Sequence, residues 1–218
     1  RKSPPVILAF GGYDPTGGAG VVMDAKAVCA AGGYAAAVPS CLALQSTAAF
    51  MRIVPLPRNV IEDSLSCAAK SFRIRVLKIG MVGTPAAAEA ILAFAVENPR
   101  LPVVLDPVLR SSSGGALLSR DALPAFRKLL RRAGVLTPNL PEIEKILDRR
   151  IASFGEAIVA ARDLSFATGA AVVLKGGHFP WKGRRGVDIV FEKRRVTLLG
   201  PGAAQPRRAG APGPGCAL

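Results

Sequence analysis

The 218-residue sequence predicts an α/β fold with a mostly parallel central sheet and helices on both faces of that sheet. Two observations support this fold class. Short apolar runs, typical of buried strands, alternate along the chain with segments whose apolar residues repeat at helical spacing. Polar or glycine-rich residues follow most of the apolar runs, and in such sheets the carboxyl ends of the strands form the ligand crevice. The length suits one domain with a sizeable core.

The first elements surround a glycine-rich stretch. Residues 6–10 form an apolar run short enough for a buried strand, and an amphipathic helix is expected over residues 21–31. Between them lies GGYDPTGGAGVVMD, residues 11–24. Residues 34–44 are small and apolar and predict a second buried strand, and residues 53–56 predict a short additional strand.

The middle of the chain continues the alternation. Residues 58–72 have apolar side chains at helical spacing, and residues 76–79 predict a strand. Thr84 and the proline that follows it predict the start of a helix that reaches Glu97. Residues 101–105 predict the next strand.

After a polar stretch rich in serine and glycine, Ser119 is the expected N-cap of a helix that ends at about Arg132. Residues 135–137 predict a strand that stops at the polar sequence PNLPE, behind which a helix extends to Leu147. The last expected elements are a helix over residues 154–168, a strand over 171–175 and a hairpin of 187–192 with 195–199. From Gly200 onward glycine, proline, alanine and arginine dominate, as in flexible tails.

The formal charge is +14, and most of the excess lies in the second half of the chain. Residues 1–125 hold 12 basic and 8 acidic side chains, and the remaining residues hold 17 and 7. The sequence has no RNP-like aromatic pattern or metal-finger spacing, and one Trp and two Tyr offer few surfaces for base stacking. A solvated basic surface that attracts polyphosphate substrates is therefore expected, and nucleic acid is not the expected partner.

Other classes of protein are disfavoured by composition. The sequence has no apolar run near the ~20 residues that a membrane span needs and no basic-then-apolar leader, so a cytoplasmic protein without membrane contact is expected. The cysteines lack CxxC spacing, which argues against a zinc site and a disulfide framework; they are Cys29, Cys41, Cys67 and Cys216.

The glycine-rich stretch leads from a predicted strand into a helix N-terminus. Such a turn brings backbone N–H groups and the positive end of the helix dipole to one place, which suits a polar or anionic ligand. The spacing is neither GxGxxG nor GxxxxGK[ST]. A purely structural tight turn remains the alternative, because glycine is the usual residue of any strained turn.

Polar or sulfur-containing side chains stand at the ends of the predicted strands, where parallel strands would bring them to one rim. They are Asp14, Gln45, Met81, Asp106, Asn139 with Glu142, and Lys175.

Asp106, Asn139 and Glu142 offer hard oxygen donors on neighbouring strand ends, and such donors suit a Mg²⁺ ion that carries a phosphate substrate. Each residue also has a structural explanation. Asp106 before proline is a turn former, and Glu142 in a first helical turn opposes the helix dipole.

Lys175 ends a very apolar run and precedes Gly-Gly-His. An ammonium group at the rim could neutralise phosphate oxygens during phosphoryl transfer, and the alternative is an ordinary lysine at a strand end. His178, the single histidine, is expected to be a surface or ligand-edge residue and not a catalytic base.

The C-terminal sequence APGPGCAL contains Gly-x-Gly-Cys. Gly213 and Gly215 could contribute backbone N–H groups to a nest that binds the transferring phosphoryl group. Cys216 at such a positive end could form a thiolate that takes a proton from a hydroxyl. The alternative is a tail without this role.

Taken together, the motifs resemble those of the hydroxymethylpyrimidine/phosphomethylpyrimidine kinase family of thiamine biosynthesis, which belongs to the ribokinase-like superfamily. The resemblance covers nearly the whole chain through GGYDPTGGAGVVMDAKA, LALQST, LKIGM, VVLDPV with SSSGG, LTPNLPE, VVLKGGH and a degenerate GPGCAL. Several ordered motifs at family-like spacing are far more specific than one glycine loop.

The resemblance implies a three-layer ribokinase-like fold and a reaction. ATP would phosphorylate 4-amino-5-hydroxymethyl-2-methylpyrimidine and then its monophosphate. It also implies that Asp106, Asn139 and Glu142 handle Mg²⁺ and water, that Lys175 contacts the ATP phosphates and that Cys216 is the base. The residues it assigns to the pyrimidine pocket are Gly12, Ala19, Asp24, Gln45, Met81 and Val108. A homodimer is the usual assembly in the family.

The departures from the family pattern lie at the end of the chain. Where the family has Thr-His-Gly-Thr-Gly-Cys-Thr-Leu, Pro212 and Pro214 replace the His and the second Thr. Pro214 removes one N–H from the anion hole of Gly213 and Gly215, and loss of such a donor costs about 2.7–4 kcal/mol of transition-state stabilisation. We expect slow catalysis or a different placement of this segment.

The expected domain is a single kinase domain over residues 1–218 that lacks the C-terminal helices of the family, with the degenerate motif in residues 200–218. Two other functions stay open. One is a pyridoxal-type vitamin kinase of the same fold, and Gln45 and Met81 favour the pyrimidine over it. The other is a pyrimidine-binding protein with weak catalysis.

Overall fold

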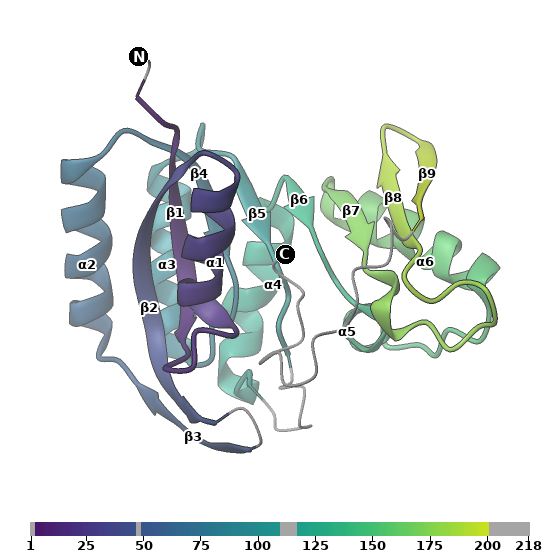
Figure 1. The fold of residues 1–218 in the computed structure, drawn as a ribbon, viewed down its shortest axis with the longest axis horizontal. Helices are drawn as coiled ribbons and strands as arrows, with labels where there is room; N and C mark the ends of the chain where they lie inside the picture. Colours follow the sequence, from purple (N-terminus) through teal and green to yellow (C-terminus); the bar gives the residue numbers. More distant parts are fainter. Residues whose placement is uncertain (1–2, 47–48, 110–116, 201–218) are drawn as a thin grey trace.

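A nine-stranded sheet forms the centre of the molecule in the computed structural model, which describes residues 3–46, 49–109 and 117–200 (Figure 1). The strand order is β3-β2-β1-β4-β5-β6-β7-β8-β9. The strands are β1 (Val6–Tyr13), β2 (Tyr34–Gln45), β3 (Phe50–Pro55), β4 (Ile74–Ile79), β5 (Val103–Leu105), β6 (Val135–Leu136), β7 (Ala171–Leu174), β8 (Asp188–Glu192) and β9 (Arg195–Leu199).

The six central strands, from β2 to β7 in spatial order, are all parallel. At one edge β3 pairs antiparallel with β2, and at the other edge β8 and β9 form an antiparallel hairpin beside β7. This arrangement confirms the predicted mostly parallel sheet. Because the central strands share one direction, their carboxyl ends all lie at the same edge, the lower one in Figure 1.

Helices cover both faces of the sheet (Figure 1). Helix α1 packs against β1 and β2 on the front face, whereas α3 and α4 lie behind the sheet and contact each other. Helix α2 packs against α3, and α6 packs against β7, β8 and α4. The helices are α1 (Gly20–Ala30), α2 (Arg58–Ser71), α3 (Pro85–Glu97), α4 (Leu123–Arg132), α5 (Leu140–Leu147) and α6 (Phe154–Thr168).

The main core lies between the sheet and the helices behind it. Strand residues alternate in direction, so Leu77 and Ile79 of β4 are fully buried in this core while Lys78 between them points to the front face. Other fully buried members are Leu8, Phe10, Leu105, Leu136, Ile61, Ile91, Leu129 and Leu164. A second, smaller cluster lies near the carboxyl ends of the strands and borders the candidate site.

Two sequence-based boundaries differ from the structure for clear physical reasons, and a third is confirmed. β1 extends to Tyr13, because the backbone of Gly11 and Gly12 continues to pair with β2. The predicted cap at Ser119 is wrong: its side chain makes no cap hydrogen bond, and a single 3₁₀ turn over Arg120–Ala122 precedes α4. By contrast, the Thr84 cap is confirmed, since its hydroxyl accepts a hydrogen bond from the Ala87 N–H at 3.2 Å.

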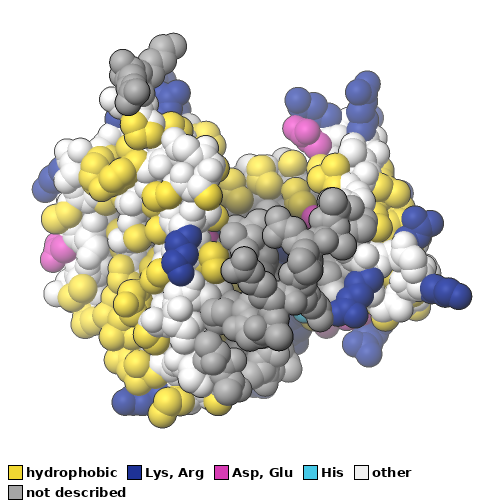
Figure 2. All heavy atoms as spheres, in the orientation of Figure 1, with side chains coloured by type: hydrophobic (Ala, Val, Ile, Leu, Met, Phe, Trp, Pro, Cys, Tyr) yellow, Lys and Arg dark blue, Asp and Glu magenta, His cyan; other side chains and the backbone are white. Residues whose placement is uncertain are grey.

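Basic side chains gather at the hairpin edge of the molecule. Figure 2 shows Lys and Arg on the right-hand part, which is formed by β7, β8, β9 and α6. In the parts of the chain that the structure describes, no helix combines the length and apolar character needed to cross a membrane.

Candidate active site

The structure brings the predicted strand-end residues to one rim. Gly12 lies near the end of β1, and Gln45 is the last residue of β2. Met81, Asp106 and Lys175 follow β4, β5 and β7 by one or two residues, and Asn139 follows β6. Because these strands are neighbours in a parallel sheet, the rim is continuous from Gln45 to Lys175.

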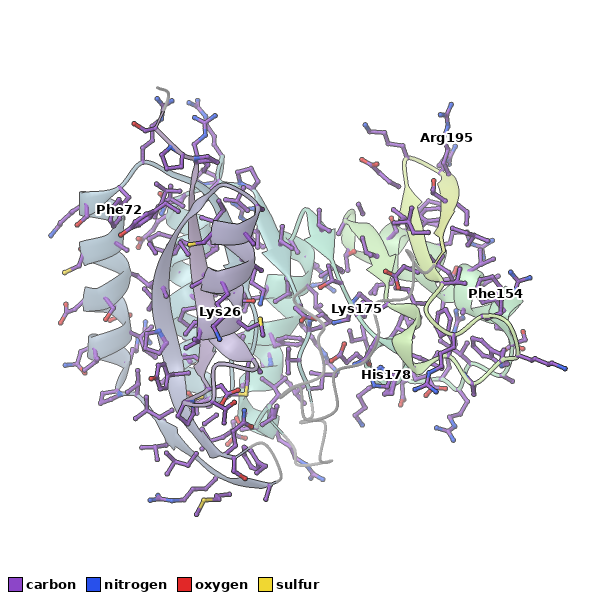
Figure 3. All side chains as sticks on the ribbon, in the orientation of Figure 1. Lys26, Phe72, Phe154, Lys175, His178 and Arg195 are labelled. Atoms are coloured by element: carbon purple, nitrogen blue, oxygen red, sulfur yellow. The ribbon has the colours of Figure 1, made fainter. Side chains whose placement is uncertain are left out.

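The glycine-rich turn between β1 and α1 is held by its own hydrogen bonds. Asp14 is buried, and its Oδ1 accepts hydrogen bonds from both the N–H and the hydroxyl of Thr16 at 2.9 Å. Lys26 reaches back from α1 and donates to the Gly17 carbonyl at 2.8 Å (Figure 3). Ala19 is the N-cap of α1 without a side-chain cap. The turn therefore has a fixed shape before any ligand binds.

An apolar pocket wall lies beside this turn. Met81, Cys41, Ala43 and Leu117 form the smaller buried cluster, against which Val108 packs. The Ser40 hydroxyl donates to the Met81 carbonyl at 2.7 Å and fixes the backbone there.

Gly12 makes the position of Met81 possible. A Cβ atom at residue 12 would lie 2.5 Å from Met81 Cε and 3.5 Å from Cys41 Sγ. A side chain at residue 12 would force the end of the Met81 side chain to move. Three of the predicted pocket residues, Gly12, Met81 and Val108, thus come together in one apolar wall.

Asp24 lies next to that wall, paired with a lysine. The Nζ of Lys78 lies 2.7 Å from both carboxylate oxygens of Asp24. The pair is largely enclosed, with side-chain exposures of 7% for Asp24 and 25% for Lys78. Since a Cβ at Gly80 would lie 3.1 Å from Lys78 Nζ, the pair sits directly beneath the end of β4, one residue from Met81.

Gln45 stands at the other side of the rim. It pairs with Phe50 across the β2–β3 ladder, where the register shifts by one residue. Phe50 in turn packs against the apolar cluster that contains Met81. Gln45 therefore borders the same region, at the edge of the parallel part of the sheet.

An ion pair of Lys175 and Asp106 lies at the carboxyl ends of β7 and β5. Lys175 Nζ donates to Asp106 Oδ1 at 2.7 Å, and each side chain is 18% exposed. The backbone N–H of Lys175 donates to the Pro138 carbonyl at 2.8 Å, which places it beside Asn139. Figure 3 shows Lys175 and His178 at the end of β7. His178 is exposed, as expected for a surface residue.

Asn139 and Glu142 form a reciprocal cap at the start of α5. The Asn139 side chain accepts from the Glu142 N–H at 2.9 Å, and the Glu142 carboxylate accepts from the Asn139 N–H at 2.7 Å. Burial raises the pKa of Glu142 to about 7; Lys175 and the hydrogen bond from Asn139 oppose that rise, and Asp106 adds to it. Glu142 thus has a structural role in the first turn of α5, next to the Lys175–Asp106 pair.

Comparison with known proteins identifies the family. A family model described as phosphomethylpyrimidine kinase matches residues 14–218. The chain belongs to the phosphomethylpyrimidine kinase family. Apart from Gly12, the match includes the residues named above for the apolar wall, the rim and the charged strand ends.

Sequence similarity to a protein of thiamine biosynthesis is consistent with this family. The chain is 33% identical over 221 residues to the thiamine biosynthesis multifunctional protein ThiED of Corynebacterium efficiens, covering 100% of this chain but only 29% of that protein. It therefore spans less than a third of the length of that relative.

Two solved structures share the fold. The phosphomethylpyrimidine kinase of Clostridium difficile matches with a TM-score of 0.81 and 29% identity over 90% of this chain and 84% of that one. A pyridoxal kinase of Bacillus subtilis, solved as an ADP complex, matches with a TM-score of 0.81 and 25% identity over 96% and 80% of the two chains. The ribokinase-like fold expected from the motifs is confirmed.

Some predicted site residues of this family member lie outside the described part of the chain. They are the proposed base Cys216 and the anion-hole residues Gly213 and Gly215. Sequence reasoning in turn missed Lys78 and Lys26. The signal for Lys78 was a single charged residue inside the apolar strand sequence VLKI, where a charge needs a partner.

Glu142 should make the free energy of unfolding depend on pH. Folding raises the pKa of Glu142 from 4.5 to about 7. Below pH 4.5 the residue is protonated in both the folded and the unfolded chain, so it does not make the free energy of unfolding change with pH there. Between pH 4.5 and 7 the unfolded chain loses this proton first, so the free energy of unfolding should fall by about 3 kcal/mol as pH rises. Glu142→Gln keeps a cap acceptor and should flatten that slope in chemical denaturation measured across this range. A slope unchanged in the variant would contradict the assignment.

Gly176, directly after Lys175, allows close backbone contact. Its N–H donates to Asp188 Oδ1 at 2.7 Å, and a Cβ atom at this residue would overlap the carbonyl group of Val187. Gly176→Ala should therefore lower the free energy of unfolding by roughly 2–4 kcal/mol. Gly177→Ala is the matched control, because no atom of the described residues lies within 4 Å of a Cβ there. Equal thermal unfolding of the two variants would contradict this account.

Proposed function

We propose that this chain transfers a phosphoryl group from ATP to 4-amino-5-hydroxymethyl-2-methylpyrimidine and then to the resulting monophosphate. One observation carries the proposal: a small apolar wall and a lysine–carboxylate group lie side by side on one rim. They are joined by residues 106–108, since Asp106 belongs to the charged group and Val108 to the wall. A pyrimidine ring can lie on the apolar wall while the phosphates reach the lysine–carboxylate pair.

Asp24, Gln45 and the apolar wall would recognise the pyrimidine. A carboxylate and an amide can hydrogen-bond an aminopyrimidine edge, while Met81 and Val108 contact its ring. Lys78 orients the Asp24 carboxylate through contacts of 2.7 Å to both oxygens. Gly12 and Ala19 supply backbone close to the ring without bulky side chains.

Lys175 would neutralise the phosphates of ATP, and Asp106, Asn139 and Glu142 would hold Mg²⁺ and its waters. The donors fit that ion in type, since two carboxylates and an amide give only hard oxygen ligands. Within the described residues, no group of three His, Cys, Asp or Glu side chains is placed to hold a metal ion by itself. When bound, Mg²⁺ would neutralise charge on the phosphates.

Cys216 would serve as the base, with Gly213 and Gly215 in the anion hole. In the reaction the substrate hydroxyl oxygen forms a bond to the γ-phosphorus, the bond from that phosphorus to ADP breaks, and the hydroxyl proton passes to the Cys216 thiolate. Pro214 cannot donate a hydrogen bond to the transferring group, so turnover should be slow for a kinase of this family.

Release of ADP tests the proposal directly. The chain is incubated with ATP, Mg²⁺ and either hydroxymethylpyrimidine or pyridoxal, and ADP is followed by a coupled assay. Faster turnover of the pyrimidine supports the proposal. Preference for pyridoxal would favour the vitamin-kinase alternative, which the similarity to a pyridoxal kinase supports. Tight pyrimidine binding without ADP release would indicate a binding protein.

Asp24→Ala and Gln45→Ala should each weaken pyrimidine binding about tenfold or more while ATP affinity stays within about twofold, because each loses a hydrogen bond to the ring alone. Titration calorimetry with each ligand separately measures both affinities. Asp63→Ala, an exposed carboxylate on α2, is the control for Asp24. Unchanged pyrimidine affinity in both variants would remove these residues from the pocket.

A cytoplasmic homodimer completes the proposal. The expected assembly can be checked by analytical ultracentrifugation at several protein concentrations, where a monomer at all of them would contradict it.

A further inference from the structure

A cleft of about 720 Å³ lies at the end of the sheet opposite the candidate active site. It is lined by the residues around the start of β4 and by the turn between α3 and β5, so it adjoins the amino ends of these strands (Figure 1). Its volume falls within the range of small-ligand sites, roughly 300–1,000 Å³. None of its lining residues takes part in the proposed phosphoryl transfer.

Three arginines line this cleft, and one carboxylate accompanies them. Arg73, Arg75 and Arg100 are all exposed, and Glu97 is the acidic residue of the lining. Among the residues that the structure describes, none of the three guanidinium groups forms an ion pair. The cleft therefore carries excess positive charge that a bound anion would neutralise.

The backbone turns Arg75 out of the regular strand pattern. The pairing of β1 with β4 passes from Val6–Ile74 directly to Ile7–Val76, so Arg75 is an extra residue in β4. Such bulges redirect a side chain and are common beside functional sites. Arg73 and Arg75, at the start of β4, thus line the cleft beside this irregularity in the strand.

The turn that carries Arg100 is also fixed in place. Arg132, the last residue of α4, donates from Nε to the Ala95 carbonyl at 3.1 Å. Its Nη2 donates to three more carbonyls at 2.9–3.1 Å, those of Asn98, Pro99 and Leu101. These bonds hold the α3–β5 turn, so the position of Arg100 does not depend on a ligand to order it.

We propose that this cleft binds a compact anion that carries two or more phosphate groups. Guanidinium groups bind phosphate oxygens in paired, charge-assisted hydrogen bonds, and three of them around one cleft exceed what a single phosphate needs. Among the described residues, the lining contains no aromatic side chain on which a nucleobase could stack, so a small polyphosphate fits the cleft better than single-stranded nucleic acid.

Titration calorimetry with inorganic pyrophosphate at low salt tests this site. Two variants are compared with the parent chain: the combined replacement of Arg73, Arg75 and Arg100 by alanine, and a control that replaces Arg127, Lys128 and Arg195, which are exposed and outside the cleft. We expect the cleft variant to bind at least about tenfold more weakly and the control to bind like the parent. Circular dichroism verifies that both fold.

The proposed ATP site could also bind pyrophosphate, so the measurement is repeated in a variant of that site to distinguish binding at the two places. In Lys175→Met the binding that depends on the three arginines should persist unchanged. Loss of that binding in Lys175→Met, equal weakening in the charge-matched control, absence of binding by the parent, or binding of a short oligonucleotide in preference to pyrophosphate would each overturn the proposal. Failure of kinase activity would not affect it.

Discussion

Lys175→Met is expected to lower kcat by about 10²–10³, because it removes the charge that we propose stabilises the transferring phosphoryl group. The lysine reaches the rim from the end of β7, and its Nζ lies 2.7 Å from Asp106 Oδ1. Methionine keeps the length and apolar stem of the side chain but not its charge. The affinity for the pyrimidine should change little, since the apolar wall lies at neighbouring strand ends.

Steady-state kinetics with separate titrations of ATP and pyrimidine measure this effect. Lys128→Met, on the exposed side of α4, is the matched control and should keep the parent kcat. Loss of the ammonium should also raise the pKa of Glu142 further, because Lys175 is one of the groups that lower it. A variant with the parent kcat would exclude Lys175 from the transfer step.

Cys216→Ser is expected to lower kcat by about 10²–10⁴, the range that general-base catalysis contributes. Serine preserves the size of the side chain but ionises far less readily than a thiol, so it cannot accept the substrate proton at neutral pH. Pyrimidine affinity should stay within about twofold. Single-turnover kinetics with saturating ATP isolates this step from product release.

Cys67→Ser on α2 provides the control, because that cysteine is free and exposed. Equal turnover in Cys216→Ser and the parent would remove the base assignment. Equal losses in the two serine variants would point to a general effect on the fold and not to the chemistry.

Much of the fold followed from local patterns. The apolar runs around Leu8, Leu77 and Leu105 are strands, and proline after Thr84 marks a helix start, because burial and capping act over a few residues. Ser119 shows the limit of such reasoning, since a good capping residue precedes a 3₁₀ turn and leaves the helix to begin at Leu123.

The site was predictable where it depended on strand direction. Polar residues after parallel strands must meet at one edge, so the neighbourhood of Asp106 and Lys175 could be expected before their contact was seen. Pairings between distant residues could not. The contact of Lys78 with Asp24 joins residues 54 positions apart, and nothing local in either segment specifies it.

The short link between the apolar wall and the charged group has a consequence for substrate choice. The Asp106 N–H is bonded to the Ile79 carbonyl at 2.8 Å and the Val108 N–H to the Asp106 carbonyl at 2.8 Å, which fixes this link rigidly. In the proposed reaction, this link would set the distance between the ring and the phosphates. The proposed substrate has one methylene between ring and hydroxyl, and a homologue with a two-carbon arm would place its hydroxyl differently relative to this fixed link and should be a poorer acceptor.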